Sequence, residues 1–173
     1  MKNTTLVIGG CRSGKSSHAL ELAEKIPADK KIFIATGVAF DKEMEQRIKR
    51  HQKERSKNWS TIETPVHLAE AITKNSQKNN VILVDCLTLW INNLLLENSD
   101  QESIDENIRQ LTAAFNRSEC PVILVANEVG AGIVPENRLA RLFRDSAGLV
   151  NQKTAACSDS VVWMVAGIPV KIK

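Results

Sequence analysis

The sequence predicts an α/β fold with a mainly parallel sheet flanked by helices, because short apolar segments alternate with helical patterns along its 173 residues. The apolar segments are rich in β-branched residues, and their continuous apolar character is typical of parallel strands covered on both faces. The last two segments are separated only by Gly167-Ile168-Pro169. We therefore expect them to form an antiparallel hairpin at the C-terminal edge of the sheet. The length suits one domain, residues 1–173.

Each element follows from its own pattern. The first apolar strand runs into glycines, and the helix after it carries alanine and leucine at helical spacing until Pro27 stops it. A charged, helix-prone stretch with few apolar residues follows the second strand, and later helical patterns alternate with apolar strands. Strands are expected at 4–8, 31–35, 81–84, 121–125, 160–165 and 170–172. Helices are expected at 16–26, 41–57, 66–72, 87–96, 104–115 and 137–156.

Composition argues against several classes of protein. Aromatic residues make up 4% of the chain and there is no Tyr, which disfavours single-stranded nucleic-acid binding through stacked bases. The net charge of +3 is too small to indicate a duplex-binding protein. No apolar run approaches the roughly 20 residues of a membrane span, and the N-terminus lacks a signal-peptide pattern. We expect a cytoplasmic protein with no nucleic-acid partner and no stable membrane insertion. The cysteines lack zinc-site spacing and suggest a reducing compartment: Cys11, Cys86, Cys120 and Cys157.

A phosphate-binding loop follows the first strand. The motif G-x-x-x-x-G-K-[ST] is matched by Gly9, Gly10, Cys11, Arg12, Ser13, Gly14, Lys15 and Ser16. A strand before it and a helix after it disfavour the alternative of a chance glycine-rich turn. The backbone N–H groups and the helix N-terminus would face phosphate oxygens. Lys15 would reach the β- and γ-phosphates as a catalytic residue, and the Ser16 hydroxyl would bind Mg²⁺. The motif predicts a RecA-like P-loop NTPase fold.

Asp85 directly follows the apolar strand 81–84. An acid at the carboxyl end of a strand, beside a phosphate loop, is the Walker B arrangement that holds the metal or its water. The alternative is an acidic cap for the next helix. Together with the loop, the position favours Ser16 and Asp85 as the Mg²⁺ ligands.

The densest positive patch surrounds His51. If this stretch is helical, Arg47, His51 and Arg55 share one face, because they are spaced by four. Flanking arginines disfavour the imidazolium, and a neutral imidazole beside phosphate-binding cations can attack phosphorus. The alternative is a solvated basic helix with an incidental histidine, and the pattern by itself favours that alternative.

Taken together, these residues resemble the bifunctional adenosylcobinamide kinase / adenosylcobinamide-phosphate guanylyltransferase family of cobalamin biosynthesis. The resemblance covers nearly the whole chain and is most specific in the block 127–138, for which residue patterns alone offer only a loop and a helix cap. The block is expected near the active site, at the end of the strand 121–125. The matching segments are the loop 9–16, Ile34-Ala35-Thr36, Glu43-Met44, Arg47-Ile48, His51, the block 127–138, Phe143-Arg144-Asp145, Ala147-Gly148, Val150-Asn151-Gln152 and 167–172.

The resemblance implies two reactions and a set of residues. It implies phosphorylation of adenosylcobinamide by ATP or GTP, followed by transfer of GMP from GTP, through a guanylylated His51, to adenosylcobinamide phosphate. Family members look trimeric, so a homo-oligomer is expected. We further expect a mobile helical arm at about 37–60, because this stretch is polar and light in apolar residues. The nucleotide contacts implied beyond the loop are Ala35, Thr36, Gly37, Gln52, Lys53, Glu54, Arg55, Glu63 and Asp85.

Two other functions remain open from the sequence. A simple small-molecule P-loop kinase would share the loop and Asp85 but would not use a nucleophilic histidine. A RecA-like NTPase module could instead bind nucleic acid through the basic patch, with a steep salt dependence. The weak net charge and the scarcity of aromatic residues count against that second alternative.

Overall fold

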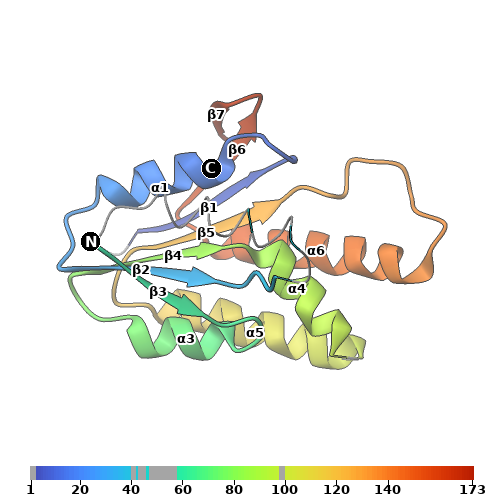
Figure 1. Ribbon diagram of the computed structural model, residues 1–173, viewed down its shortest axis with the longest axis horizontal. Coiled ribbons are helices and arrows are strands. Elements are labelled where there is room, and N and C mark those ends of the chain that lie inside the picture. Colours follow the sequence, from blue (N-terminus) through green and yellow to red (C-terminus); the bar gives the residue numbers. More distant parts are fainter. Residues whose placement is uncertain (1–2, 40–41, 43–45, 47–57, 98–99) are drawn as a thin grey trace.

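Parallel strands dominate the sheet of the computed structural model, which describes residues 3–39, 42, 46, 58–97 and 100–173. Within these residues seven strands form one sheet in the order β3-β2-β4-β5-β1-β6-β7, and only β6 and β7 pair antiparallel (Figure 1). The strands are β1 Thr4–Gly9, β2 Lys30–Ala35, β3 Trp59–Glu63, β4 Asn80–Asp85, β5 Val122–Asn127, β6 Ser160–Val165 and β7 Ile168–Lys171. The helices are α1 Lys15–Glu24, α3 Leu68–Asn75, α4 Leu87–Leu96, α5 Gln101–Arg117 and α6 Arg138–Cys157.

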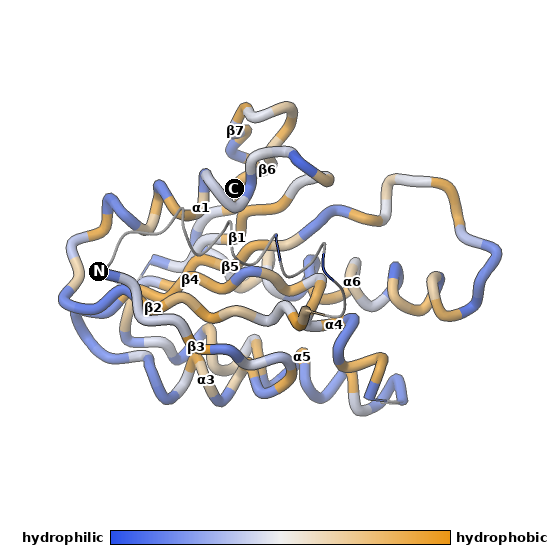
Figure 2. Tube along the Cα trace, viewed as in Figure 1, coloured by the Kyte–Doolittle hydropathy of each residue, from blue (hydrophilic) through white to orange (hydrophobic). Residues whose placement is uncertain are grey.

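Alternation along the strands builds a separate core on each face of the sheet. Residues such as Val7, Leu83 and Val125 pack with Ala19 and Ala23 of α1 on one face. Their strand neighbours pack on the opposite face against α3, α4, α5 and α6. Figure 2 accordingly shows the central strands as the most hydrophobic part of the trace, with hydrophilic segments along the outer sides of the helices. This doubly covered arrangement explains the continuous apolar strands in the sequence.

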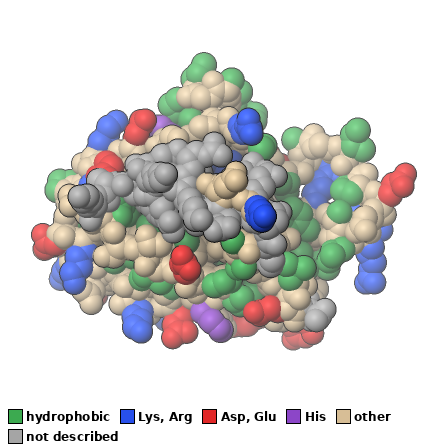
Figure 3. Space-filling view, viewed as in Figure 1, with side chains coloured by type: hydrophobic (Ala, Val, Ile, Leu, Met, Phe, Trp, Pro, Cys, Tyr) green, Lys and Arg blue, Asp and Glu red, His purple; other side chains and the backbone are tan. Residues whose placement is uncertain are grey.

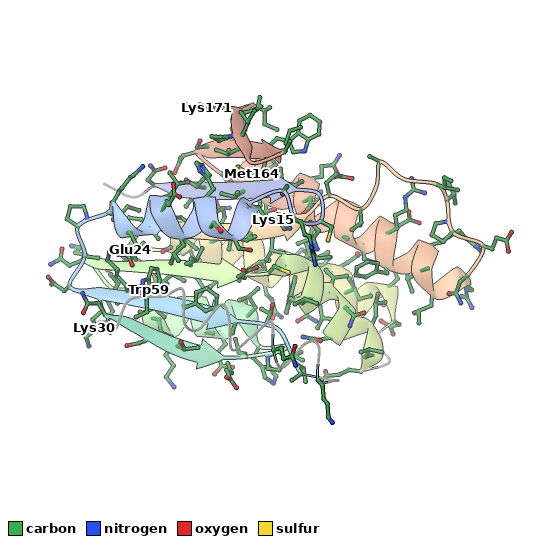
Figure 4. The ribbon with its side chains drawn as sticks, turned by 45° about the horizontal axis from the view of Figure 1, so that its top comes forward. Lys15, Glu24, Lys30, Trp59, Met164 and Lys171 are labelled. Atoms are coloured by element: carbon green, nitrogen blue, oxygen red, sulfur yellow. The ribbon has the colours of Figure 1, made fainter. Side chains whose placement is uncertain are left out.

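The edge strand β3 was not predicted. Its residues are exposed or half-buried and none is buried, and the strand lacks the apolar run that marks the central strands. It is held by Trp59, whose Nε1 donates to Glu24 Oε1 at 2.7 Å. The Trp59 ring also meets Phe33 edge-on, with the ring centroids 6.4 Å apart. Glu24 lies at the end of α1, as Figure 4 shows, and it also forms an ion pair with Lys31. Partners 35 residues apart in sequence therefore hold this strand.

Several predicted boundaries shift. The first helix ends at Glu24 rather than at residue 26, and the helix predicted from 66 begins at Leu68. The hairpin turn is Ala166-Gly167, with φ of 50° and 84°, so Ile168 and Pro169 belong to β7 and not to the turn. The helix predicted for 41–57 and most of the arm predicted for 37–60 lie outside the described residues. Among the helices that are described, none combines the length and apolarity that crossing a membrane requires.

Candidate functional site

The carboxyl ends of the parallel strands place the described members of the predicted site along one edge of the sheet. Ala35 of β2 is in register with Glu63 of β3 on one side and with Asp85 of β4 on the other. Gly9, the last residue of β1, is in register with Asn127 of β5. Because β5 lies between β4 and β1, one continuous edge carries the predicted metal ligand and the phosphate loop.

The phosphate loop is shaped by left-handed backbone positions. Arg12 has φ 54° and Gly14 has φ 86°, and Gly14 is the N-cap of α1. The Ser13 N–H donates to the Gly10 carbonyl at 3.3 Å. Lys15 Nζ donates to the same carbonyl at 3.1 Å, so the side chain lies along the loop rather than pointing into solvent. Figure 4 shows Lys15 where the phosphate loop passes into α1. The positive end of α1 and this ammonium group suit a polyphosphate.

The C-terminal hairpin, β6 and β7, contacts the phosphate loop and constrains its shape. The Gly167 N–H donates to the Ser13 carbonyl at 3.1 Å. A Cβ atom on Gly9 would lie 2.6 Å from Ser13 Oγ and 2.7 Å from the Met164 carbonyl oxygen, so only glycine fits at the end of β1. The sequence motif predicted the loop but not this support, because Met164 and Gly167 come from the opposite end of the chain.

Thr36 fixes the chain that follows Asp85. Its hydroxyl accepts from the Cys86 N–H at 2.8 Å and donates to the Cys86 carbonyl at 2.7 Å. Asn93 Nδ2 donates to the Thr36 carbonyl at 2.7 Å, and Thr36 is fully buried. The Asp85–Cys86 peptide bond is cis. The hydroxyl of Thr36 is thus occupied within the protein, and a nucleotide contact through residues 35–37 stays a prediction.

The buried thiol of Cys86 is poorly suited to act as a nucleophile. Burial raises the pKa of its thiol to about 12, and the adjacent Asp85 charge adds to this, whereas Lys15 lowers it only in part. The thiolate, which is the reactive form, is therefore scarce near neutral pH.

The donor set at the edge suits Mg²⁺ held jointly with phosphate. Ser16 in the first turn of α1 and Asp85 at the end of β4 are both half-buried and supply oxygen ligands. Within the described residues, no cluster of three or more His, Cys, Asp or Glu side chains could hold a metal without a ligand. Mg²⁺ characteristically binds one or two protein oxygens together with phosphates and waters. Hydroxyl and carboxylate oxygens at a phosphate loop therefore fit this ion.

The structure shows little about the roles of the remaining predicted residues and of another histidine, His67. Glu63 is exposed at the end of β3, and Gly37 is half-buried beside Leu89. His67 is the exposed N-cap residue of α3, and its side chain makes no capping hydrogen bond. His51 and the predicted nucleotide contacts Gln52, Lys53, Glu54 and Arg55 lie outside the described residues.

The block 127–138 does begin at this edge, as the resemblance implied. The Glu128 N–H donates to the Gly9 carbonyl at 3.0 Å, and Glu128 Oε1 accepts from the Ala131 N–H at 3.1 Å. The rest of the block projects from the body of the protein before α6 (Figure 1). Hydrophobic side chains, among them Ile133 and Val134, are exposed on this projection, which forms the right-hand lobe in Figure 3. Residue patterns alone missed the block, although polar residues directly after a buried strand gave the same signal as Asp85.

Comparison with known sequences points to one family. A family model described as "Cobinamide kinase / cobinamide phosphate guanyltransferase" matches residues 5–172. The chain is 46% identical to "Bifunctional adenosylcobalamin biosynthesis protein CobU" of Salmonella typhimurium, over 97% of this chain and 98% of that protein. It is 39% identical to "Bifunctional adenosylcobalamin biosynthesis protein CobP" of Pseudomonas aeruginosa, over 97% of this chain and 96% of that protein.

Solved structures support the fold. An ATPase of a bacterial type III secretion system aligns with a TM-score of 0.63 at 10% identity, covering 98% of this chain and 56% of that one. The ATPase domain of another protein aligns with a TM-score of 0.53 at 15% identity, covering 94% of this chain and 69% of that one. These likenesses concern the fold alone, and they confirm the predicted P-loop NTPase fold. On the strength of the family match and the near full-length relatives, the chain belongs to the cobinamide kinase / cobinamide phosphate guanyltransferase family.

Proposed function

We propose that this chain phosphorylates adenosylcobinamide with a nucleoside triphosphate and then transfers GMP from GTP to the resulting phosphate, giving adenosylcobinamide-GDP and pyrophosphate. The observation that carries the proposal is the sheet edge on which the phosphate loop and Asp85 meet, in a chain that matches its family from residue 5 to residue 172. The family description names both activities, and the relatives are called bifunctional, so a simple kinase is not favoured.

In the first reaction the chain binds and orients the triphosphate. The N–H groups of residues 9–16 and the Lys15 ammonium hold the β- and γ-phosphates, and charge that develops on the γ-phosphoryl group is stabilised by these fixed donors. Ser16 and Asp85 would hold Mg²⁺, which supplies further neutralisation of the phosphate oxygens when bound. The aminopropanol hydroxyl of adenosylcobinamide attacks the γ-phosphorus, and the nucleoside diphosphate leaves.

In the second reaction His51 is the nucleophile. Its neutral imidazole attacks the α-phosphorus of GTP, the bond from that phosphorus to the bridging oxygen breaks, and pyrophosphate leaves. The phosphate of adenosylcobinamide phosphate then attacks the same phosphorus and displaces GMP from the ring. Lys15 assists by stabilising the pyrophosphate leaving group. Arg47 and Arg55, four residues before and after His51 in the sequence, supply further cations that could bind it.

Labelling the protein with GTP that carries ³²P at the α-phosphate tests the proposal. We expect acid-labile, alkali-stable label on the wild type, as a phosphorus–nitrogen bond requires, and its loss in His51→Ala. The matched control is His67→Ala, because His67 is exposed and makes no capping bond. Label on the wild type that survives in His51→Ala would exclude His51 as the nucleophile. If the wild type takes up no label but still transfers the γ-phosphoryl group, the protein would be a simple kinase without guanylyl transfer.

A further inference from the structure

Asn127 occupies the one strand end between the phosphate loop and the predicted metal ligand. It closes β5, which lies between β1 and β4. Strand alternation places its side chain on the same face as Val125, which packs in the α1 core. Asp85 follows Leu83 on β4 in the same way, and Leu83 belongs to that core as well. The Asn127 side chain, the Asp85 carboxylate and the phosphate loop therefore share the α1 side of the sheet edge.

The backbone of Asn127 is held in place by two buried side chains from different helices. Its N–H donates to Thr88 Oγ1 at 2.7 Å, and its carbonyl accepts from Asn151 Nδ2 at 3.1 Å. Thr88 of α4 is 5% exposed and Asn151 of α6 is 7% exposed. Side chains from two helices thus fix the position of this strand end, in addition to the backbone pairing within the sheet.

These two hydrogen bonds involve only the backbone of Asn127 and not its side-chain amide. Among the described residues, Asn127 Oδ1 is buried without a hydrogen-bond partner, and Ser13 Oγ of the phosphate loop shares that condition. Buried polar atoms are almost always paired, so an unpaired one on a fixed backbone, at the edge where a ligand binds, indicates that the ligand supplies the partner. An amide offers an acceptor and a donor side by side.

We propose that the Asn127 amide contacts both the attacking hydroxyl and the γ-phosphoryl group in the kinase reaction, an inference that rests on the proposed function. Because β5 lies between β1 and β4, a γ-phosphate bound by Lys15 of the phosphate loop would lie near the end of β5. Asp85 at the end of β4 would help to hold Mg²⁺, which would neutralise charge on that phosphate. The amide oxygen accepts from the substrate hydroxyl, and the amide NH₂ donates to an oxygen of the γ-phosphoryl group only in the transition state of its transfer, so this contact does not contribute to binding of the triphosphate. The hydroxyl oxygen is thereby aligned with the γ-phosphorus.

The step is an in-line displacement. The bond from the hydroxyl oxygen to the γ-phosphorus forms as the bond from that phosphorus to the β–γ bridging oxygen breaks. The electron pair stays on the nucleoside diphosphate, and the hydroxyl proton ends on an oxygen of the transferred phosphoryl group. Asn127 orients this proton but does not accept it, because a neutral amide is not basic. Guanylylation of His51 occurs at the α-phosphorus and involves no substrate hydroxyl, so it does not use Asn127.

The test compares the two reactions in the same variant. In Asn127→Leu, which keeps the approximate size and loses both hydrogen-bonding groups, we expect kcat for γ-phosphoryl transfer to adenosylcobinamide to fall at least about tenfold, the effect of one lost hydrogen bond. The KM for the triphosphate and the rate of α-³²P labelling should stay within about twofold of wild type. Asn107→Leu is the control, since Asn107 is also half-buried and its amide donates to the Ser103 carbonyl within the same helix, α5.

Each outcome decides the matter. Unchanged phosphoryl transfer, or an equal fall of phosphoryl transfer and labelling, would overturn the role of Asn127. If the leucine variant does not fold, Asn127→Ala removes the same amide without adding bulk and carries the same expectation. A wild type without phosphoryl transfer would overturn the proposed kinase activity itself, and with it this inference. An active wild type with an equally active variant would overturn the inference alone.

Discussion

The ends of β1 and β5 lie side by side, in register at Gly9 and Asn127, but they are built in opposite ways. The phosphate loop after β1 gains its shape mainly within eight residues, from left-handed positions and from hydrogen bonds to Gly10. The end of β5 is fixed by side chains 39 and 24 residues away. The end of β1 therefore carries a motif that can be recognised in the sequence. The end of β5 is also held in place by hydrogen bonds, but it carries no such motif.

The largest effect is expected in the phosphate loop after β1, where Lys15 would contact the nucleoside triphosphate. Lys15→Ala should lower both γ-phosphoryl transfer and His51 guanylylation by about 10²–10³-fold, because it removes a fixed charge from phosphates that take part in both reactions. Initial rates with GTP labelled at the γ- or the α-phosphate measure the two reactions. Lys25→Ala is the control, since Lys25 is exposed at the C-cap of the same helix. Loss of only one reaction would show that the two do not share the phosphate loop.

The second effect tests the shape of that loop. Gly9→Ala should destabilise the protein by about 1–3 kcal/mol, because the new methyl group meets Ser13 Oγ and the rigid Met164 carbonyl. Gly10→Ala is the matched variant, because a Cβ atom there meets nothing within 4 Å, and its stability should stay within about 0.5 kcal/mol of wild type. Urea unfolding measures both. Equal stability of the two variants would mean that the hairpin does not constrain the end of β1.

The same contrast explains what the sequence predicted. The phosphate loop, Asp85 and the central strands were predicted because each depends on residues adjacent in the chain. The strand β3 was not, since it depends on Trp59 reaching Glu24. The anchoring roles of Thr36 and Thr88 were not predicted either, because a threonine hydroxyl gives no periodic signal and its partner is set by the tertiary fold.

The third effect tests an end built by remote contacts. Thr36→Val removes the hydroxyl that bridges both backbone groups of Cys86. The buried Cys86 N–H then loses its partner, and the Cys86 carbonyl keeps only the Trp90 N–H. We expect a loss of about 2 kcal/mol in the free energy of unfolding. Thr36→Ser keeps the hydroxyl and loses one methyl group, so it should lose only about 1 kcal/mol. Urea unfolding at neutral pH compares them. A serine variant as unstable as the valine variant would assign the role to packing instead of hydrogen bonding.

The smallest expected effect is a change of stability with pH that is absent at neutral pH. It concerns the thiol of Cys86, the residue whose backbone is bound by Thr36. The folded protein raises the pKa of Cys86 to about 12 from an ordinary value of 9.0, mainly by burial. Between these pH values the unfolded chain releases the thiol proton while the folded chain keeps it, so stability falls as pH rises through this window. Well below pH 9.0 both states hold the proton, and the thiol then contributes no pH dependence.

Cys86→Ala isolates this contribution. The difference in unfolding free energy between wild type and variant should be constant from about pH 7 to pH 8.5, because it then reflects packing alone. Above that range it should shift in favour of the variant, with a slope approaching one proton, since the variant has no thiol to ionise on unfolding. Urea unfolding at closely spaced pH values measures the slope. A difference that stays flat to about pH 10.5 would mean that Cys86 is accessible to water, and that the corner beside Asp85 is less tightly closed than the contacts of Thr36 require.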